Sequence, residues 1–175
     1  MNMNQQLLQQ ELHNWRNQTG IDFNIGCTWH VPNAMRYHQQ GYDDIWLSKT
    51  LNCYLNKVDR HLFKAAHRNR GVRLPRFIFL EHTAGVGWHA HGYLAQAPKL
   101  TAEATIQALQ AHWLKHCKNY KTQAFENRLF HAVEIDAGFN FYAAKQAFSG
   151  SDTGTQSGTF SGKMDINNVV TNYKH

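Results

Sequence analysis

The chain of 175 residues is 42% hydrophobic and carries 18 lysines and arginines against 12 acids, which gives a formal net charge of +6. This length and composition suit one globular domain with its own core and exclude a disordered chain, while the positive charge favours a polyanionic partner such as nucleic acid. No apolar run reaches the 18 residues of a membrane span and the polar start lacks the layout of a secretory signal, so we expect a cytoplasmic protein with no membrane partner.

The first half of the chain predicts a helix, a strand and a second, long helix. Leucines at helical spacing in a Gln- and Asn-rich background indicate an N-terminal helix over residues 1–20. Residues 22–30 alternate apolar and polar side chains, which predicts a strand that Pro32 ends. From about Asp43 to Arg70, apolar residues recur at steps of three and four, so we expect a long amphipathic helix.

Four arginines lie at the end of this long helix and in the segment that follows it: Arg68, Arg70, Arg73 and Arg76. Positive charge at a helix C-terminus is electrostatically favourable, and the same side chains could contact nucleic-acid phosphates. A solvated helix end explains the pattern equally well. The four arginines are our candidate nucleic-acid-binding residues.

The second half of the chain predicts a hairpin, a helix, a strand and a last helix. Residues 76–82 and 88–95 are strand-like and are separated by a glycine-containing loop, as in a β-hairpin. Residues 101–117 open with a capping-type threonine and form one apolar face, which predicts a helix. Residues 128–135 predict a further strand, and the stretch FNFYAAKQAF at 139–148 predicts the last helix.

The resulting order β-α-β-β-α-β-α is a split βαβ pattern. It predicts an α+β fold, RRM-like or ferredoxin-like, with a four- to five-stranded antiparallel sheet, helices on one face and a final helix that bears a tyrosine. The Gly-, Ser- and Thr-rich composition after residue 148 is typical of a flexible tail. We therefore expect an N-terminal helix over 1–20, a folded domain over 21–148 and a tail over 149–175.

The predicted hairpin carries the strongest candidate for a site. Residues two apart in a strand project from the same face, so His89 and His91 are expected side by side. If the loop is centred on Gly85, Glu81 lies across from His89. Two imidazoles and a carboxylate can bind a divalent cation, with Mn²⁺ or Mg²⁺ suited to phosphate chemistry. An HxH pair alone would face solvent about as often, and Glu81 opposite the pair favours the metal site.

A second candidate lies on the last predicted helix. Tyr142 and Lys145 are three residues apart, so they share one helical face. A tyrosine oxygen can attack a phosphodiester if a metal polarises the phosphate, and a neighbouring lysine could stabilise the phenolate or hold the phosphate. In isolation, such a pair is usually a half-buried tyrosine beside a solvated lysine. The pair is therefore a candidate catalytic site only because it follows the histidine hairpin in the sequence.

An HxH hairpin followed by YxxK on the last helix resembles the HUH endonuclease superfamily, and within it the single-tyrosine Rep proteins that initiate rolling-circle replication. The resemblance covers about residues 22–148. The family's first motif is matched loosely by FNIGCTW at 23–29. Ala90 is small for the hydrophobic middle position of the histidine motif.

This resemblance implies a role for each matched residue. Glu81, His89 and His91 would hold Mn²⁺ or Mg²⁺, Tyr142 would be the nucleophile and Lys145 its helper. The domain would nick and rejoin single-stranded or hairpin origin DNA through a 5′-phosphotyrosine intermediate. Because no GxxxxGK[ST] motif occurs in the chain, we expect DNA unwinding to need a separate helicase.

Two other interpretations stay open. A related single-tyrosine transposase or relaxase would use the same chemistry on different DNA ends. A non-catalytic RRM-like nucleic-acid-binding module would instead stack bases on the strand aromatics Phe77, Phe79 and Tyr93. Neither strand carries the RNP1 pattern that such modules use.

Overall fold

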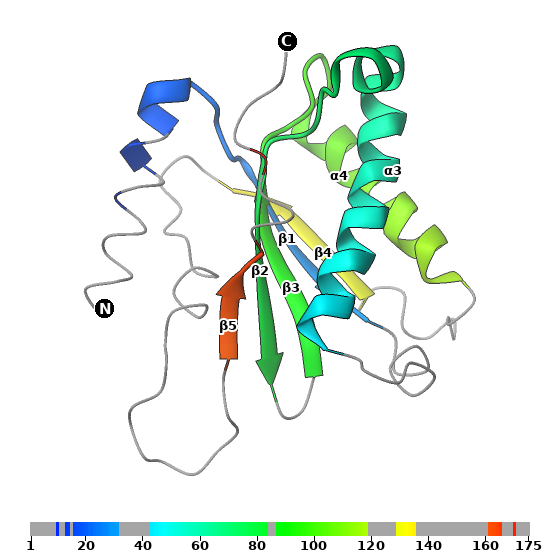
Figure 1. Ribbon diagram of the computed structural model, residues 1–175. Helices are drawn as coiled ribbons and strands as arrows, with labels where there is room; N and C mark the ends of the chain where they lie inside the picture. Colours follow the sequence, from blue (N-terminus) through cyan, green and yellow to red (C-terminus); the bar gives the residue numbers. More distant parts are fainter. Residues whose placement is uncertain are drawn as a thin grey trace.

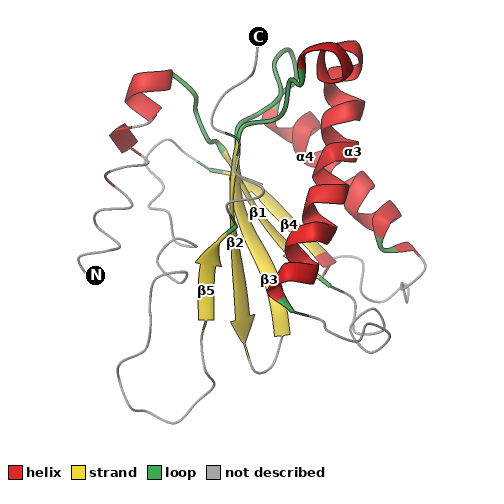
Figure 2. Ribbon diagram, viewed as in Figure 1, coloured by secondary structure: helices red, strands yellow, loops and turns green. Residues whose placement is uncertain are grey.

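The structure is a computed structural model that describes residues 10, 13–14, 16–31, 43–83, 87–118, 129–135, 161–165 and 170. Within this part the chain is an α+β protein in which two helices cover one face of an antiparallel sheet (Figures 1 and 2). The α+β class and the antiparallel sheet that the sequence predicts are confirmed. No helix in these ranges is long and apolar enough to cross a membrane.

The sheet has five strands in the order β4-β1-β3-β2-β5, and each neighbouring pair is antiparallel. The strands are β1 (Ile25–His30), β2 (Arg76–Thr83), β3 (Gly87–Leu94), β4 (Phe130–Glu134) and β5 (Ser161–Met164). The first four fall within two or three residues of the predicted strand boundaries. The predicted hairpin is confirmed as β2 and β3, with Glu81 opposite His89.

Helix α3 (Asp44–Arg70) follows β1, and both of its ends are capped by identifiable groups. The Asp43 carboxylate accepts a hydrogen bond from the Trp46 backbone N–H at 2.8 Å. At the other end Gly71 has a φ of 67°, a left-handed conformation that glycine adopts without strain. Inside the helix, Lys64 departs from helical geometry with a φ of 46°, so the last part of α3 lies beyond a kink.

Helix α4 (Ala102–His116) follows β3 and packs against both α3 and β4. Its first turn is capped by the Thr101 hydroxyl, which accepts from the Ala104 backbone N–H at 3.1 Å. Two buried aromatic residues fix its position through hydrogen bonds. The Tyr54 hydroxyl donates to the Leu109 carbonyl at 2.9 Å, and the Trp113 indole N–H donates to the Leu129 carbonyl at 2.8 Å.

Side chains alternate between the two faces of the sheet along β1, β2 and β3. One set packs beneath α3 and α4 as part of the hydrophobic core: Ile25, Trp29, Ile78, Leu80 and Ala90. The alternate positions face away from the helices and include polar side chains on three adjacent strands: Thr28, His30, Glu81, His89 and His91. This second face positions the candidate site.

Gly92, on the helix-facing side of β3, is required by the packing of Trp29. A Cβ atom at Gly92 would lie 2.6 Å from Cζ3 of Trp29 and 2.8 Å from Cδ1 of Ile78. Both of these neighbours are fully buried. The strand next to His91 is therefore backed by a closely packed aromatic ring with no room for a further methyl group.

The region expected to be a flexible tail contributes a strand to the sheet. Residues Ser161–Met164 form β5, which pairs with β2 and becomes the edge strand of the sheet, and Val170 exchanges two further backbone hydrogen bonds with Arg76. Asp165 is buried and its carboxylate accepts from the Ser48 hydroxyl at 2.8 Å. Edge pairing uses backbone groups, so a Gly- and Ser-rich composition does not prevent it. In the expected N-terminal helix, residues 10, 13–14 and 16–19 are helical.

Candidate metal centre

Glu81, His89 and His91 converge on the face of the sheet that lies away from the helices. One potential ligand atom from each residue can be chosen so that all three lie within 4.8 Å of one another. The Glu81 Oε2 atom lies 3.3 Å from Nε2 of His89 and 3.2 Å from Nε2 of His91. The hairpin register produces this arrangement, because it pairs Glu81 with His89 and leaves His91 two residues along the same face.

Each imidazole is held in place through its other ring nitrogen. Nδ1 of His89 lies 3.0 Å from the Gly87 carbonyl oxygen, which can only accept, so Nδ1 carries the proton and donates. Nδ1 of His91 lies 2.9 Å from the Thr28 hydroxyl. Such contacts orient histidine rings in metal sites. In the neutral form of His89, the Nε2 lone pair is therefore directed toward Glu81.

The Glu81 carboxylate is ionised although it is only 1% exposed. Burial raises the pKa of this carboxyl group. Hydrogen bonds from His89 and His91 and the positive charge of these imidazoles lower it by more, so the pKa is about 2 instead of the ordinary 4.5. Its second oxygen, Oε1, is buried and makes no hydrogen bond within the described part of the chain. A buried anion needs positive charge nearby, and either protons on the imidazoles or a cation between the three groups can supply it.

This donor set fits a divalent metal ion. One carboxylate and two imidazoles offer mixed oxygen and nitrogen ligands, and three protein ligands leave coordination positions for water or a substrate oxygen. The unpaired Oε1 gives Glu81 a second oxygen for the same ion. The part of the chain that the structure describes contains no second group of three ligands that meets this geometry.

Two neighbours of the centre, Thr28 and His30, were not identified from the sequence. The β1–β3 register places Thr28 beside His91 and His30 beside His89, and the rings of His30 and His89 stack at 5.4 Å with 15° between their planes. Their spacing of two residues on a strand was visible in the sequence. The register of β1 against β3 was not, because no tight turn connects these two strands and fixes it.

The two residues of the predicted nucleophile pair, Tyr142 and Lys145, lie outside the described residues. Their roles therefore stay predictions that rest on the sequence pattern.

The four candidate nucleic-acid-binding arginines separate into two groups. Arg68 and Arg70 are exposed and Arg73 is half-buried. The prediction for Arg76 is wrong, because this side chain is 1% exposed and its Nη1 donates to the Asp59 carboxylate at 2.8 Å. Arg76 lies on the helix-facing side of β2, where Asp59 of α3 meets it.

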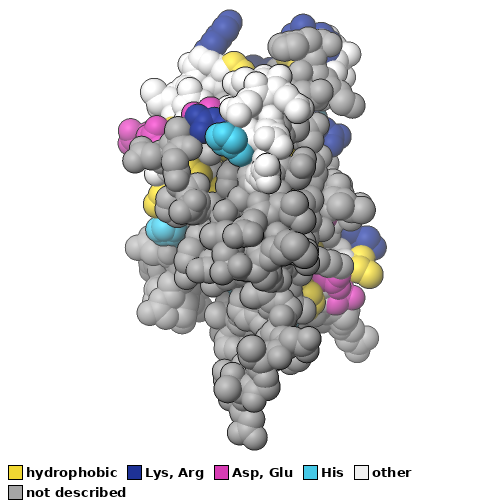
Figure 3. Space-filling view, turned by 90° about the vertical axis from the view of Figure 1, so that its left-hand side faces the viewer, with side chains coloured by type: hydrophobic (Ala, Val, Ile, Leu, Met, Phe, Trp, Pro, Cys, Tyr) yellow, Lys and Arg dark blue, Asp and Glu magenta, His cyan; other side chains and the backbone are white. Residues whose placement is uncertain are grey.

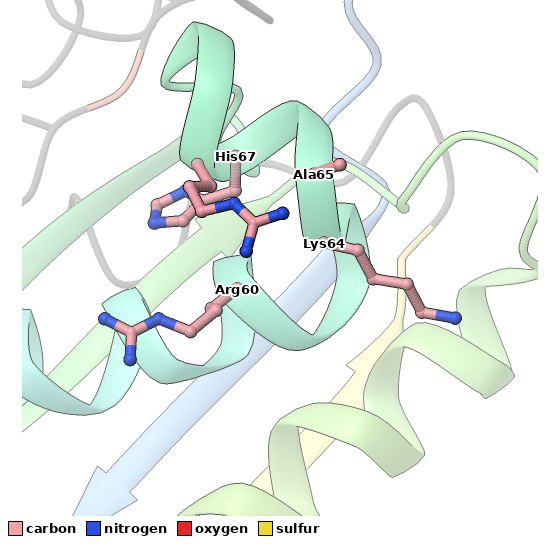
Figure 4. A pocket seen from close by; sticks show the side chains of 5 residues that line it. Arg60, Lys64, Ala65 and His67 are labelled. Atoms are coloured by element: carbon pink, nitrogen blue, oxygen red, sulfur yellow. The ribbon is translucent and has the colours of Figure 1, made fainter.

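Positive charge outside this buried pair is distributed unevenly. Figure 3 views the side of the molecule away from α3 and α4, and the described lysine and arginine side chains visible there lie at separate points. At the kinked end of α3, by contrast, Arg68 lines a pocket of about 630 Å³ together with neighbouring basic side chains, among them Arg60, Lys64 and His67 (Figure 4). Among the described side chains, positive charge therefore gathers on the helical layer.

The aromatic residues of the RRM-like interpretation are not available for base stacking in this structure. Phe79 is fully buried, Phe77 is 7% exposed and Tyr93 is 3% exposed. Phe79 packs edge-on against Tyr93 at 6.2 Å, and Phe77 contacts Phe23 at 5.1 Å. Base stacking needs exposed ring faces, so this arrangement weighs against such a module.

Comparison of the chain with protein families, with curated proteins and with solved structures found no match. The case for a function therefore rests on the metal-ligating residues, their geometry and the motif spacing in the sequence.

Proposed function

We propose that this protein is a metal-dependent endonuclease that nicks and rejoins single-stranded DNA through Tyr142, as the HUH resemblance implies. The observation that carries the proposal is the convergence of Glu81, His89 and His91 around one ionised, incompletely hydrogen-bonded carboxylate. The strand order β4-β1-β3-β2, with helices after β1 and β3, supports a split βαβ fold of the RRM-like or ferredoxin-like kind.

In this proposal Glu81, His89 and His91 hold a divalent ion, Mn²⁺ or Mg²⁺. When bound, the ion would polarise a phosphate oxygen and offset the negative charge that develops during the reaction. The protein supplies rigid support for these ligands. The Gly87 carbonyl and the Thr28 hydroxyl fix the two imidazoles, and the stacked ring of His30 restricts the movement of His89.

Tyr142 performs the chemistry in this proposal. Its phenol loses a proton, its oxygen bonds to the scissile phosphorus, and the P–O3′ bond breaks as the leaving oxygen takes up a proton. The products are a 5′-phosphotyrosine and a free 3′-hydroxyl that a polymerase can extend. Lys145 holds the phosphate or stabilises the phenolate, and reversal of the step rejoins the strands. The resemblance to Rep proteins assigns this chemistry to rolling-circle initiation, with unwinding by a separate helicase; a transposase or relaxase would use the same chemistry on other DNA ends.

The test is covalent adduct formation. The protein and a Tyr142→Phe variant are incubated with a pool of labelled single-stranded DNA and Mn²⁺ and resolved on denaturing gels, with EDTA as the metal control. A Tyr120→Phe variant removes a different phenol and serves as the matched control. We expect a metal-dependent adduct in the wild type and in Tyr120→Phe that is lost in Tyr142→Phe. Absence of an adduct with every DNA, or persistence of the adduct in Tyr142→Phe, would overturn the proposal.

A further inference from the structure

The helical layer contains a second basic pocket, here called the basic groove. It lies between α3 and α4, has a volume of about 670 Å³ and is lined by Lys57, Arg60, His61, His112, Lys115, His116 and Lys118. The helices cover the sheet face opposite the one that carries Glu81, His89 and His91 (Figure 1). A phosphate in the basic groove is therefore a different phosphate from one at the metal centre.

No carboxylate of either helix balances the charge of the basic groove. The acids of α3 and α4 are Asp44 and Glu103, each in a first turn, and Asp59, which is fully buried against Arg76. The four lysine and arginine side chains of the groove are exposed, and none of them forms an ion pair within the described part of the chain. Among the described residues, positive charge is thus concentrated in the groove without an ion-pair partner.

Helix-end electrostatics explains only part of this pattern. Lys115 and His116 occupy the last turn of α4, where positive charge is favourable. Lys57 and Arg60 lie near the middle of α3, where like charges three residues apart repel each other without a helix end to compensate. Burial, together with the positive charge of Lys57 and its neighbours, lowers the pKa of His112 and His116, which is consistent with a local excess of positive charge. An external anion would relieve this repulsion.

The basic surface is long enough for a polymer. Arg60 lines both the basic groove and the pocket at the kinked end of α3, so basic side chains continue along this helix from Lys57 to Arg68. At 1.5 Å per helical residue this segment is about 16 Å long along the chain, and the kink at Lys64 shortens the straight-line distance, so it corresponds to at most about five phosphates along one strand of a duplex. A single phosphate group would occupy only a small part of such a surface.

We infer that the basic groove binds the phosphate backbone of nucleic acid and holds a segment other than the one at the metal centre. The inference goes beyond the proposed nicking activity and depends on it only in that both sites take nucleic acid. Contacts of exposed lysines with phosphates carry no base specificity, so the groove contributes affinity and orientation.

The test compares two charge-removal variants of the full chain. Lys57→Gln/Lys115→Gln removes one lysine from each wall of the groove, and Lys49→Gln/Lys99→Gln removes two exposed lysines that do not line it. Binding of a labelled 20-base-pair duplex is followed by fluorescence anisotropy in EDTA at several salt concentrations, after thermal unfolding has shown that both variants fold. EDTA removes any contribution of the metal centre.

We expect the groove variant to bind the duplex roughly tenfold more weakly and to lose about two units of slope in the log–log salt dependence, whereas the control stays within about twofold of the wild type. The inference would be overturned if the groove variant bound the duplex as tightly as the wild type, or if the control variant lost as much affinity as the groove variant. A small phosphorylated ligand would be the better explanation if pyrophosphate stabilised the wild type but not the groove variant, while both proteins bound the duplex equally well. That result would also overturn the inference. Failure of Tyr142 adduct formation would remove the nicking proposal and leave this result unaffected.

Discussion

Strand β2 carries two buried ionic clusters, around Arg76 and around Glu81, five residues apart on opposite faces of the sheet. They differ in whether the charged side chain is neutralised by its neighbours. On the helix-facing side, Arg76 donates to Asp59 and to the Leu74 carbonyl, so a cation and an anion meet directly. On the other side, Glu81 meets the Nε2 atoms of His89 and His91, and Nε2 of a neutral His89 presents a lone pair because Nδ1 donates to the Gly87 carbonyl. In the first cluster the two opposite charges neutralise each other. In the second cluster the three ligand atoms can hold a cation between them.

This difference shows why a buried ion pair is weak support for a functional site. Both clusters contain a nearly inaccessible charged side chain, and each retains an unpaired atom among the described groups, Nε of Arg76 and Oε1 of Glu81. An unpaired N–H donor cannot hold a cation, whereas an unpaired carboxylate oxygen can. The chemical type of the unsatisfied atom, rather than burial itself, distinguishes the candidate site from a structural pair.

The largest effect is expected from removing one partner of the structural pair. Asp59→Ala would leave the Arg76 guanidinium buried without its anion and should lower the free energy of unfolding by about 3–5 kcal/mol. Urea unfolding followed by circular dichroism measures the change. Mn²⁺ should still stabilise this variant by the same increment as the wild type. A decrease in unfolding free energy of less than about 1 kcal/mol would show that water reaches Arg76 and that Asp59 is not needed to neutralise it.

Metal binding should stabilise the wild type and leave Glu81→Gln unchanged. A ligand that binds only the folded state at one hundred times its dissociation constant adds about 2.7 kcal/mol to the free energy of unfolding. Calorimetric titration gives the dissociation constant, and thermal unfolding with and without Mn²⁺ gives the increment. An equal increment in Glu81→Gln would place the metal elsewhere in the protein.

In the absence of metal, acid should destabilise the wild type more than the Glu81→Gln variant. The folded pKa of Glu81, about 2, lies below its ordinary value of 4.5, so its ionised form stabilises the fold above pH 4.5 and this contribution is lost as the pH falls toward 2. Between pH 5 and pH 3 in EDTA, the wild type should lose about 2 kcal/mol more unfolding free energy than Glu81→Gln. Parallel pH curves for the two proteins would contradict the ion-pair environment.

The smallest effect is expected at Thr28, which contacts a ligand but supplies none of the ligating atoms. Thr28→Val keeps the shape of the side chain and removes the hydroxyl that holds Nδ1 of His91, so Mn²⁺ affinity should fall by about tenfold. Thr28→Ser restores a hydroxyl and should recover most of the affinity. Equal affinities of the valine variant and the wild type would show that His91 is oriented by other groups.

The sequence predicted the parts of this architecture that depend on local spacing. A short hairpin loop fixes strand register, so counting outward from Gly85 placed Glu81 opposite His89. The same alternation puts Arg76 on the other face of β2, and applying it to position 76 would have avoided the one wrong site residue. Placing Thr28 and His30 at the centre required the register of β1 against β3, which a split βαβ pattern does not specify because the pair is non-local. Strand β5 required backbone pairing, which leaves no hydrophobic pattern in a Gly- and Ser-rich segment.

Strand β5 also has a consequence for how this protein behaves among copies of itself. By pairing with Phe79–His82, it occupies backbone donors and acceptors that would otherwise form an open edge beside the metal centre. Open edges recruit strands from other chains and promote aggregation. The edge of the sheet is then the four-residue strand β5 in place of the eight-residue strand β2, and a short edge strand is a poorer template for pairing. A fragment cut after residue 148, where composition suggests that the domain ends, would therefore be expected to self-associate.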